Sequence, residues 1–151
     1  MVRPSWVLAG DFCACPLQDL RVSNQGNLSV WVTDEQSSNV KDIVVAMASG
    51  RNHFDKVDYA LFPESLLASA NIEMQSWPGD TAHLIVNPCH RHLVKLSASK
   101  LVNLAWLISE HGTFHREQEE DVQKWLTEAL EKRIVDVKRM NPELKKLMGF
   151  G

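Results

Sequence analysis

The spacing of hydrophobic and polar residues changes several times along the chain, and each spacing predicts a different element. Residues 28–32 and 57–61 place apolar side chains at every second position, which predicts half-buried strands, and 72–77 is also expected to be extended. Residues 39–49 instead place apolar side chains on one helical face, and Gly50 follows where the helix should end. Strands and helices are therefore both expected in this chain.

Two further helices are predicted in the middle of the chain. Pro63 suits the first turn of a short helix that Asn71 can close. Ser97 is a suitable N-cap for a longer helix over residues 98–111, which should end at Gly112. Because this longer helix is apolar on nearly all sides, we expect it to be covered on more than one side and to lie at the centre of the fold.

The last predicted helix, over residues 114–140, is amphipathic. Its apolar residues form one stripe, so it should lie on the surface, and Asn141-Pro142 should end it. Acidic residues gather in its first turns and basic residues in its last turns, which complements the helix dipole. At 1.5 Å per residue such a helix is about 37 Å long, more than a domain of this size needs to cover its own sheet. Part of its apolar stripe should overhang.

Apolar residues continue beyond this helix, after Pro142: Leu144, Leu147, Met148 and Phe150. A chain that left them exposed would carry a hydrophobic patch of the kind that marks interaction sites. We therefore predict a homodimer built partly from residues Trp125 to Phe150, with the two copies related by a two-fold axis. The alternative is that this tail folds back over the core of its own chain.

The stretch from Trp77 to Leu96 holds three of the six histidines of the chain. Its apolar runs, Leu84–Val86 and residues 93–96, lie on either side of an Asn-Pro turn, and this pattern predicts a β-hairpin. A two-residue turn at Pro88-Cys89 would bring three imidazoles to one face of the hairpin: His83, His90 and His92.

This histidine cluster is the first candidate site. Imidazole titrates nearest neutral pH and is the commonest zinc ligand, and the nearby carboxylate of Asp80 could complete a metal set or orient a histidine. His83, His90 and His92 with Asp80 are thus the candidate catalytic or metal-binding residues. The alternative is structural: His92 fills part of the sheet face and His90 lies in a solvated turn.

Other candidates are weaker. Arg51 and His53 follow the predicted helix end and, with His92, are candidate ligand-binding residues, although a polar turn explains them equally well. His111 and His115 have a helix-borne metal spacing that Gly112 interrupts. The remaining candidates contain cysteine: a Cys13-x-Cys15 pair with no second pair to complete a metal site, and the neighbours Cys89 and His90.

Part of this stretch resembles a group of small uncharacterised bacterial proteins. In that group a helix, a PG[DN] turn and an Ala-His dipeptide recur, matched here by Pro78, Gly79, Asp80, Ala82 and His83. The resemblance implies no activity. The chain also lacks the dinucleotide-binding, Walker A, nucleophile-elbow and zinc-protease motifs, so none of those enzyme classes is predicted.

Composition narrows the class of protein. With 151 residues, 44% of them hydrophobic, the chain can bury a core without disulfides or metals. A formal net charge of -3 lacks the basic character typical of nucleic-acid binding. The three cysteines favour reduced thiols, and the N-terminal apolar run is too short for a signal peptide or a membrane span. A cytoplasmic protein with no membrane partner is expected.

Together these patterns predict one α+β domain over residues 1–151: an antiparallel sheet of four or five strands, helices packed mainly on one face, and a long C-terminal amphipathic helix. The leading functional hypothesis is a binding or accessory protein without a cofactor, oligomeric, that recognises a protein or a small molecule. The alternative is a small histidine-dependent hydrolase or nuclease-like enzyme, with or without a metal, that uses Asp80, His83, His90 and His92.

Overall fold

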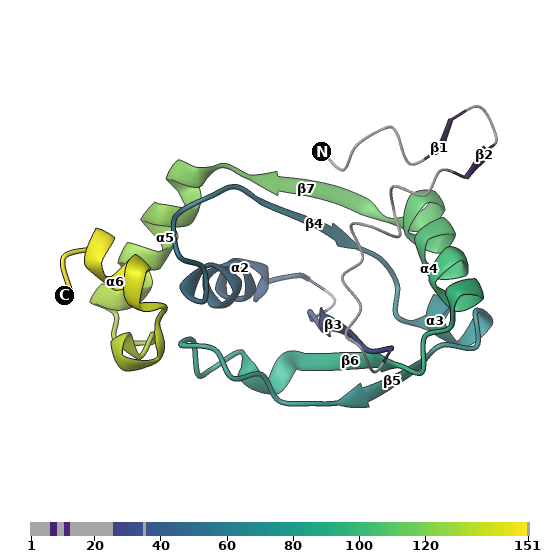
Figure 1. Cartoon of the computed structure of the whole chain (residues 1–151), viewed down its shortest axis with the longest axis horizontal. Coiled ribbons are helices and arrows are strands. Elements are labelled where there is room, and N and C mark those ends of the chain that lie inside the picture. Colours follow the sequence, from purple (N-terminus) through teal and green to yellow (C-terminus); the bar gives the residue numbers. More distant parts are fainter. Residues whose placement is uncertain (1–6, 9–10, 13–25, 35, 151) are drawn as a thin grey trace. The chain divides into compact units, whose positions relative to one another are not determined.

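The computed structural model describes residues 7–8, 11–12, 26–34 and 36–150 (Figure 1), and within them the chain is α+β, as the sequence predicts. It divides into two compact units. Unit 1 comprises Met1–Val30, Asp58–Ser76 and Arg91–Arg116, and unit 2 comprises Trp31–Val57, Trp77–His90 and Glu117–Gly151. The single domain over residues 1–151 stays a prediction, as does the packing of helices on one sheet face.

Most strand residues belong to unit 1, where they form separate small sheets. A three-stranded antiparallel sheet has the order β3-β6-β5, from β3 (Leu28–Trp31), β6 (His90–Val94) and β5 (Glu73–Ser76). A two-stranded antiparallel sheet contains β4 (Val57–Leu61) and β7 (Thr113–Glu117), which run side by side in Figure 1. The last pair is β1 (Val7–Leu8) with β2 (Asp11–Phe12).

The prediction of one sheet with four or five strands is therefore wrong. The strands over 28–32, 57–61 and 72–77 do form, but the partner of β4 is β7, a segment that the sequence pattern assigned to the last helix. Two cross-strand contacts hold this pair: the Arg116 guanidinium donates to both carboxylate oxygens of Asp58, and the Tyr59 and His115 rings stack 5.0 Å apart. Such partners lie too far apart in the sequence for a local pattern to reveal them.

Both predicted helices of unit 1 form, and only the start of the short one differs, at Ser65 instead of Pro63. The short α3 (Ser65–Ser69) is closed by Asn71 in the left-handed conformation (φ 53°), where the Ile72 N–H donates to the Leu67 carbonyl at 2.9 Å. The longer α4 (Ala98–His111) is capped by the Ser97 hydroxyl, which accepts from the Lys100 N–H at 3.3 Å. Both helices contribute to one core: Leu67, Ile72, Leu93, Leu96, Leu104 and Ile108.

The prediction that the helix over 98–111 is covered on more than one side is wrong. Only Leu104, Ala105 and Ile108 of α4 are buried, whereas Val102 and Trp106 are 37% and 38% exposed. These three buried positions follow a helical repeat of three or four residues, so α4 packs through a single stripe. Its apolar sequence therefore exceeds what its own core requires.

In unit 2 the most deeply buried helix is α2 (Val40–Ser49), which forms over the predicted range. Six of its ten residues are buried: Ile43, Val44, Val45, Ala46, Ala48 and Ser49. Helix α5 (Glu119–Glu131) packs against it, and Val122, Leu126 and Ala129 are the buried residues of α5. A helix that buries this much of its circumference lies at the centre of its core. In unit 2 this central helix is α2, whereas the sequence pattern predicted α4 as the central helix of the fold.

Lys41 fastens α2 to α5 at the surface of unit 2. Its ammonium lies 2.7 Å from the Glu128 carboxylate and 5.4 Å from the centroid of the Trp125 ring. The hydrogen bond from Lys41 holds the pKa of Glu128 below its ordinary value. A lowered carboxyl pKa stabilises the folded state above the unfolded pKa, and this contribution is lost as pH falls through the folded pKa.

The long C-terminal helix does not form as predicted. Helix α5 spans 13 residues and ends in a Schellman turn, with Arg133 left-handed (φ 58°) and the Ile134 N–H donating to the Ala129 carbonyl at 3.1 Å. A short 3-10 helix, η3 (Val137–Arg139), follows. Asn141 then does not end a helix but caps a new one, α6 (Pro142–Leu147), by accepting from the Glu143 N–H.

The residues after α5 fold back over unit 2 instead of overhanging. Met140 and Leu144 are 2% and 0% exposed and share a core cluster with Val45, Leu126 and Ala129. The alternative considered for the tail after Pro142 is thus correct for Leu144. The end of the chain differs, because Leu147 and Phe150 remain 64% and 49% exposed.

Among the described residues, no helix combines the length and the apolar character that crossing a bilayer requires.

Gly112 supplies a test of this fold. A Cβ at this position would collide with the carbonyl oxygen of Ile108, which accepts from the Gly112 N–H at 2.8 Å at the end of α4. Gly112→Ala should therefore cost about 1–3 kcal/mol, because the backbone must shift to admit the methyl group. Gly50→Ala is the matched control at a helix end, since its nearest neighbour would be 3.9 Å away, and it should change stability by less than about 0.5 kcal/mol. Chemical denaturation measures both, and equal effects would contradict the assignment.

Candidate functional site

The predicted hairpin over Trp77–Leu96 is replaced by a folded loop followed by one strand. Residues 84–86 form a turn, and Asn87–Cys89 form the short 3-10 helix η2. Strand β6 pairs with β5 in the register Met74↔Leu93 and Gln75↔His92, not with the stretch that precedes it. The hairpin prediction is therefore wrong, and with it the opposed positions that placed three histidines on one face.

Asn87 organises this loop, which we call the 77–90 loop. Its side-chain carbonyl accepts from the Thr81 hydroxyl at 2.7 Å and from the Thr81 N–H at 3.1 Å, while its amide donates to the Thr81 carbonyl at 3.1 Å. Its backbone carbonyl accepts from the Gly79 N–H at 2.8 Å. Asn87 is 8% exposed, so its amide replaces the pairing that a strand partner would give this buried backbone.

The residues of the Pro-Gly-Asp and Ala-His motifs have structural roles in the 77–90 loop. A Cβ at Gly79 would lie 3.0 Å from the Asn87 side-chain oxygen and 3.2 Å from the Trp31 ring, so only glycine leaves both in place. Ala82 is 1% exposed and belongs to the core cluster of unit 2. The Ala82 carbonyl accepts from the Asp136 N–H at 2.8 Å, which fastens the loop to the segment after α5.

His83 is the most buried titratable residue of the loop, at 0% exposed. Its Nε2 lies 3.2 Å from a carboxylate oxygen of Asp42 on α2, so Nε2–H donates to Asp42. Its Nδ1 is also buried and has no hydrogen-bond partner among the described residues. A ring enclosed on both sides cannot reach a substrate in this conformation, because a general base must come within hydrogen-bond distance of the proton that it removes.

The other members of the predicted cluster have separate surroundings. His90 donates from Nδ1 to the Trp77 carbonyl at 2.6 Å, and its ring packs edge-on against Trp31 with centroids 4.9 Å apart. His92 lies on β6 opposite Gln75. Asp80 is 89% exposed and forms an ion pair with Arg139. No three His, Cys, Asp or Glu side chains among the described residues gather as a metal site would require.

Arg51 and His53 lie in a polar turn, which agrees with the structural explanation given for them. The Arg51 guanidinium donates to the Lys56 carbonyl at 3.0 Å, and His53 Nδ1 contacts the side-chain oxygen of its neighbour Asn52. His92 belongs to unit 1 and these two residues to unit 2. A ligand-binding role for the three residues stays a prediction.

Two weaker candidates are placed by the structure and one lies outside it. His111 ends α4, whereas His115 lies on β7 against Tyr59, so the helical spacing of the pair is broken at Gly112 as expected. The Cys89 sulfur is 3.7 Å from the Asn39 amide nitrogen. Cys13 and Cys15 lie outside the described residues.

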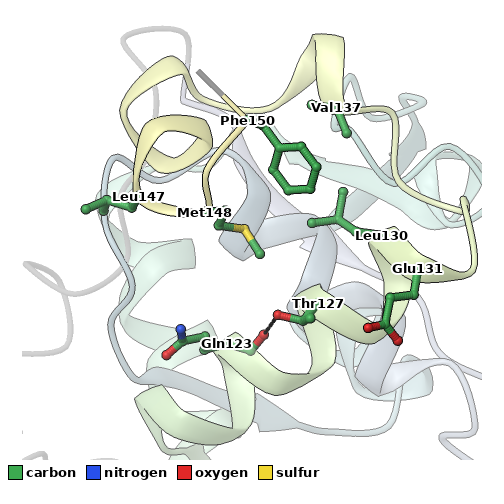
Figure 2. A pocket seen from close by; sticks show the side chains of 8 residues that line it. All are labelled: Gln123, Thr127, Leu130, Glu131, Val137, Leu147, Met148 and Phe150. Carbon is green, nitrogen blue, oxygen red and sulfur yellow. Dashed lines mark hydrogen bonds between the residues drawn. The ribbon is translucent and has the colours of Figure 1, made fainter.

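The sequence pattern missed a groove between α5 and the C-terminal segment of unit 2, shown in Figure 2. We call it the α5–α6 groove; its volume is about 570 Å³. Five of its eight lining side chains are apolar: Leu130, Val137, Leu147, Met148 and Phe150. The polar ones, Gln123, Thr127 and Glu131, lie along α5. The apolar residues after Pro142 were the sequence feature that could have indicated this groove. They form one wall of it only because the chain reverses direction at Arg133.

Apolar side chains are also exposed at the tip of the 77–90 loop. Leu84 and Ile85 are 48% and 65% exposed. They lie in the chain between Thr81 and Asn87, which are hydrogen-bonded to each other. A turn fixed on both sides keeps these two side chains in solvent instead of letting them collapse. Hydrogen bonds within the loop therefore fix its conformation, and His83 and His90 contribute to them.

Asn87→Ala tests this role. The variant should lose about 1–3 kcal/mol of stability, because it leaves half-buried polar groups of Thr81 without partners, and residues 79–86 should exchange their amide protons faster. Asn103→Ala on the exposed face of α4 is the matched control and should change stability by less than about 0.5 kcal/mol. Hydrogen exchange of the variants provides both readouts. Unchanged exchange in residues 79–86 would show that Asn87 does not organise the loop.

Known proteins offer no further guide to this site. Comparison with protein-family models found no match to the chain. Neither the curated proteins nor the solved structures contain a significant match to it. The functional conclusion therefore depends on the groove and the loop themselves.

Proposed function

We propose that this chain is a non-enzymatic binding protein that recognises an apolar group, of a small molecule or of a protein partner, in the α5–α6 groove. The observation that carries this proposal is the groove itself, with about 570 Å³ of space and five apolar lining side chains. Ligand sites commonly have volumes of about 300–1,000 Å³, mostly apolar walls and a few polar groups that orient the ligand. Gln123, Thr127 and Glu131 supply such groups along one wall.

Exposure supports binding at this surface. Leu147 and Phe150 remain 64% and 49% exposed beside the groove, although the neighbouring Leu144 is fully buried. Apolar side chains gathered at a concave surface favour association, since covering them removes apolar area from water at roughly 25 cal/mol per Å². Apart from Gln123, the residues that line this surface lie within Trp125 to Phe150, the range for which the sequence predicts a homodimer.

Catalysis by the Asp80, His83, His90 and His92 set is the alternative hypothesis, and the geometry supports it less. His83 is enclosed and donates to Asp42, His90 donates to a backbone carbonyl, and Asp80 pairs with Arg139. Each of these polar groups already has a structural partner. Metal analysis of protein purified without a histidine tag separates the hypotheses: a stoichiometric metal that disappears in a His90→Ala/His92→Ala variant would favour the enzyme.

Filling the groove tests the proposed function. The uncharged dye Nile red should bind the protein saturably, and Thr127→Trp should weaken binding about tenfold or more by placing a large ring in the groove. Thr127 is exposed, and its hydroxyl only donates to the Gln123 carbonyl of its own helix, as Figure 2 shows, so the fold should tolerate the change. Dye fluorescence, titrated at low protein concentration, measures the dissociation constant.

Two controls locate the dye. Asp121→Trp adds the same ring at an exposed position of α5 that lies about 120° around the helix from Thr127 and does not line the groove, so it should leave the dissociation constant unchanged. Leu84→Ser/Ile85→Ser removes the exposed apolar side chains at the tip of the 77–90 loop and should also leave it unchanged. Binding that survives Thr127→Trp but is lost in the loop variant would place recognition at the 77–90 loop and contradict the proposal.

A further inference from the structure

We draw no further inference here: the strongest candidate, the surface patch of the exposed side chains of Leu84 and Ile85 at the tip of the 77–90 loop, carries nothing beyond the proposed function, because nothing in the described part of the chain shows what covers it.

Discussion

The amide of Asn87 is the interaction on which the 77–90 loop of unit 2 depends. It gives the half-buried polar groups of Thr81 the partners that a neighbouring strand would otherwise supply. Residues 79–87 can therefore form a loop instead of a hairpin arm. Strand β6 can then pair with β5 and β3, and Ala82 and His83 enter the core of unit 2.

Burial gives the histidines of this loop their role. Enclosing a polar ring is costly unless it is hydrogen-bonded, and His83 and His90 meet this requirement through Asp42 and the Trp77 carbonyl. These bonds occupy one nitrogen of each ring, and the second nitrogen of His83 is enclosed without a partner among the described residues. The histidine cluster, which suggests a reactive site in the sequence, is thus explained in the fold by the packing of the loop, and binding stays the function that we propose.

The C-terminal segment combines two tasks in a few residues. Met140 and Leu144 complete the core of unit 2, and Leu147 and Phe150 then remain at the rim of the groove that this fold-back creates. Removing the segment after Asn141 would therefore remove the core residue Leu144 together with one wall of the groove. For that reason point substitutions at exposed positions distinguish stability from association where truncation would not.

The sequence by itself determined the elements whose signals are local. Alternation gave β3 and β4, helical spacing gave α2 and α4, and the hydroxyl of Ser97 and the left-handed Asn71 mark helix ends because capping acts within one turn of the chain. The exposed acidic start of α5 was likewise evident, since charges near a helix end act on that end alone.

Only the tertiary structure decided which segments meet. Strand β7 forms because Arg116 bonds to Asp58 and His115 stacks on Tyr59, two residues more than fifty positions earlier in the chain. The long predicted helix ends early because Arg133 adopts a left-handed conformation, and the turn there lets Met140 and Leu144 reach the core. The local pattern of apolar residues in the helix does not reveal this gain in buried apolar area. The groove is the product of that return. It belongs to neither α5 nor α6 alone, so its residues could be recognised only once both walls were in place.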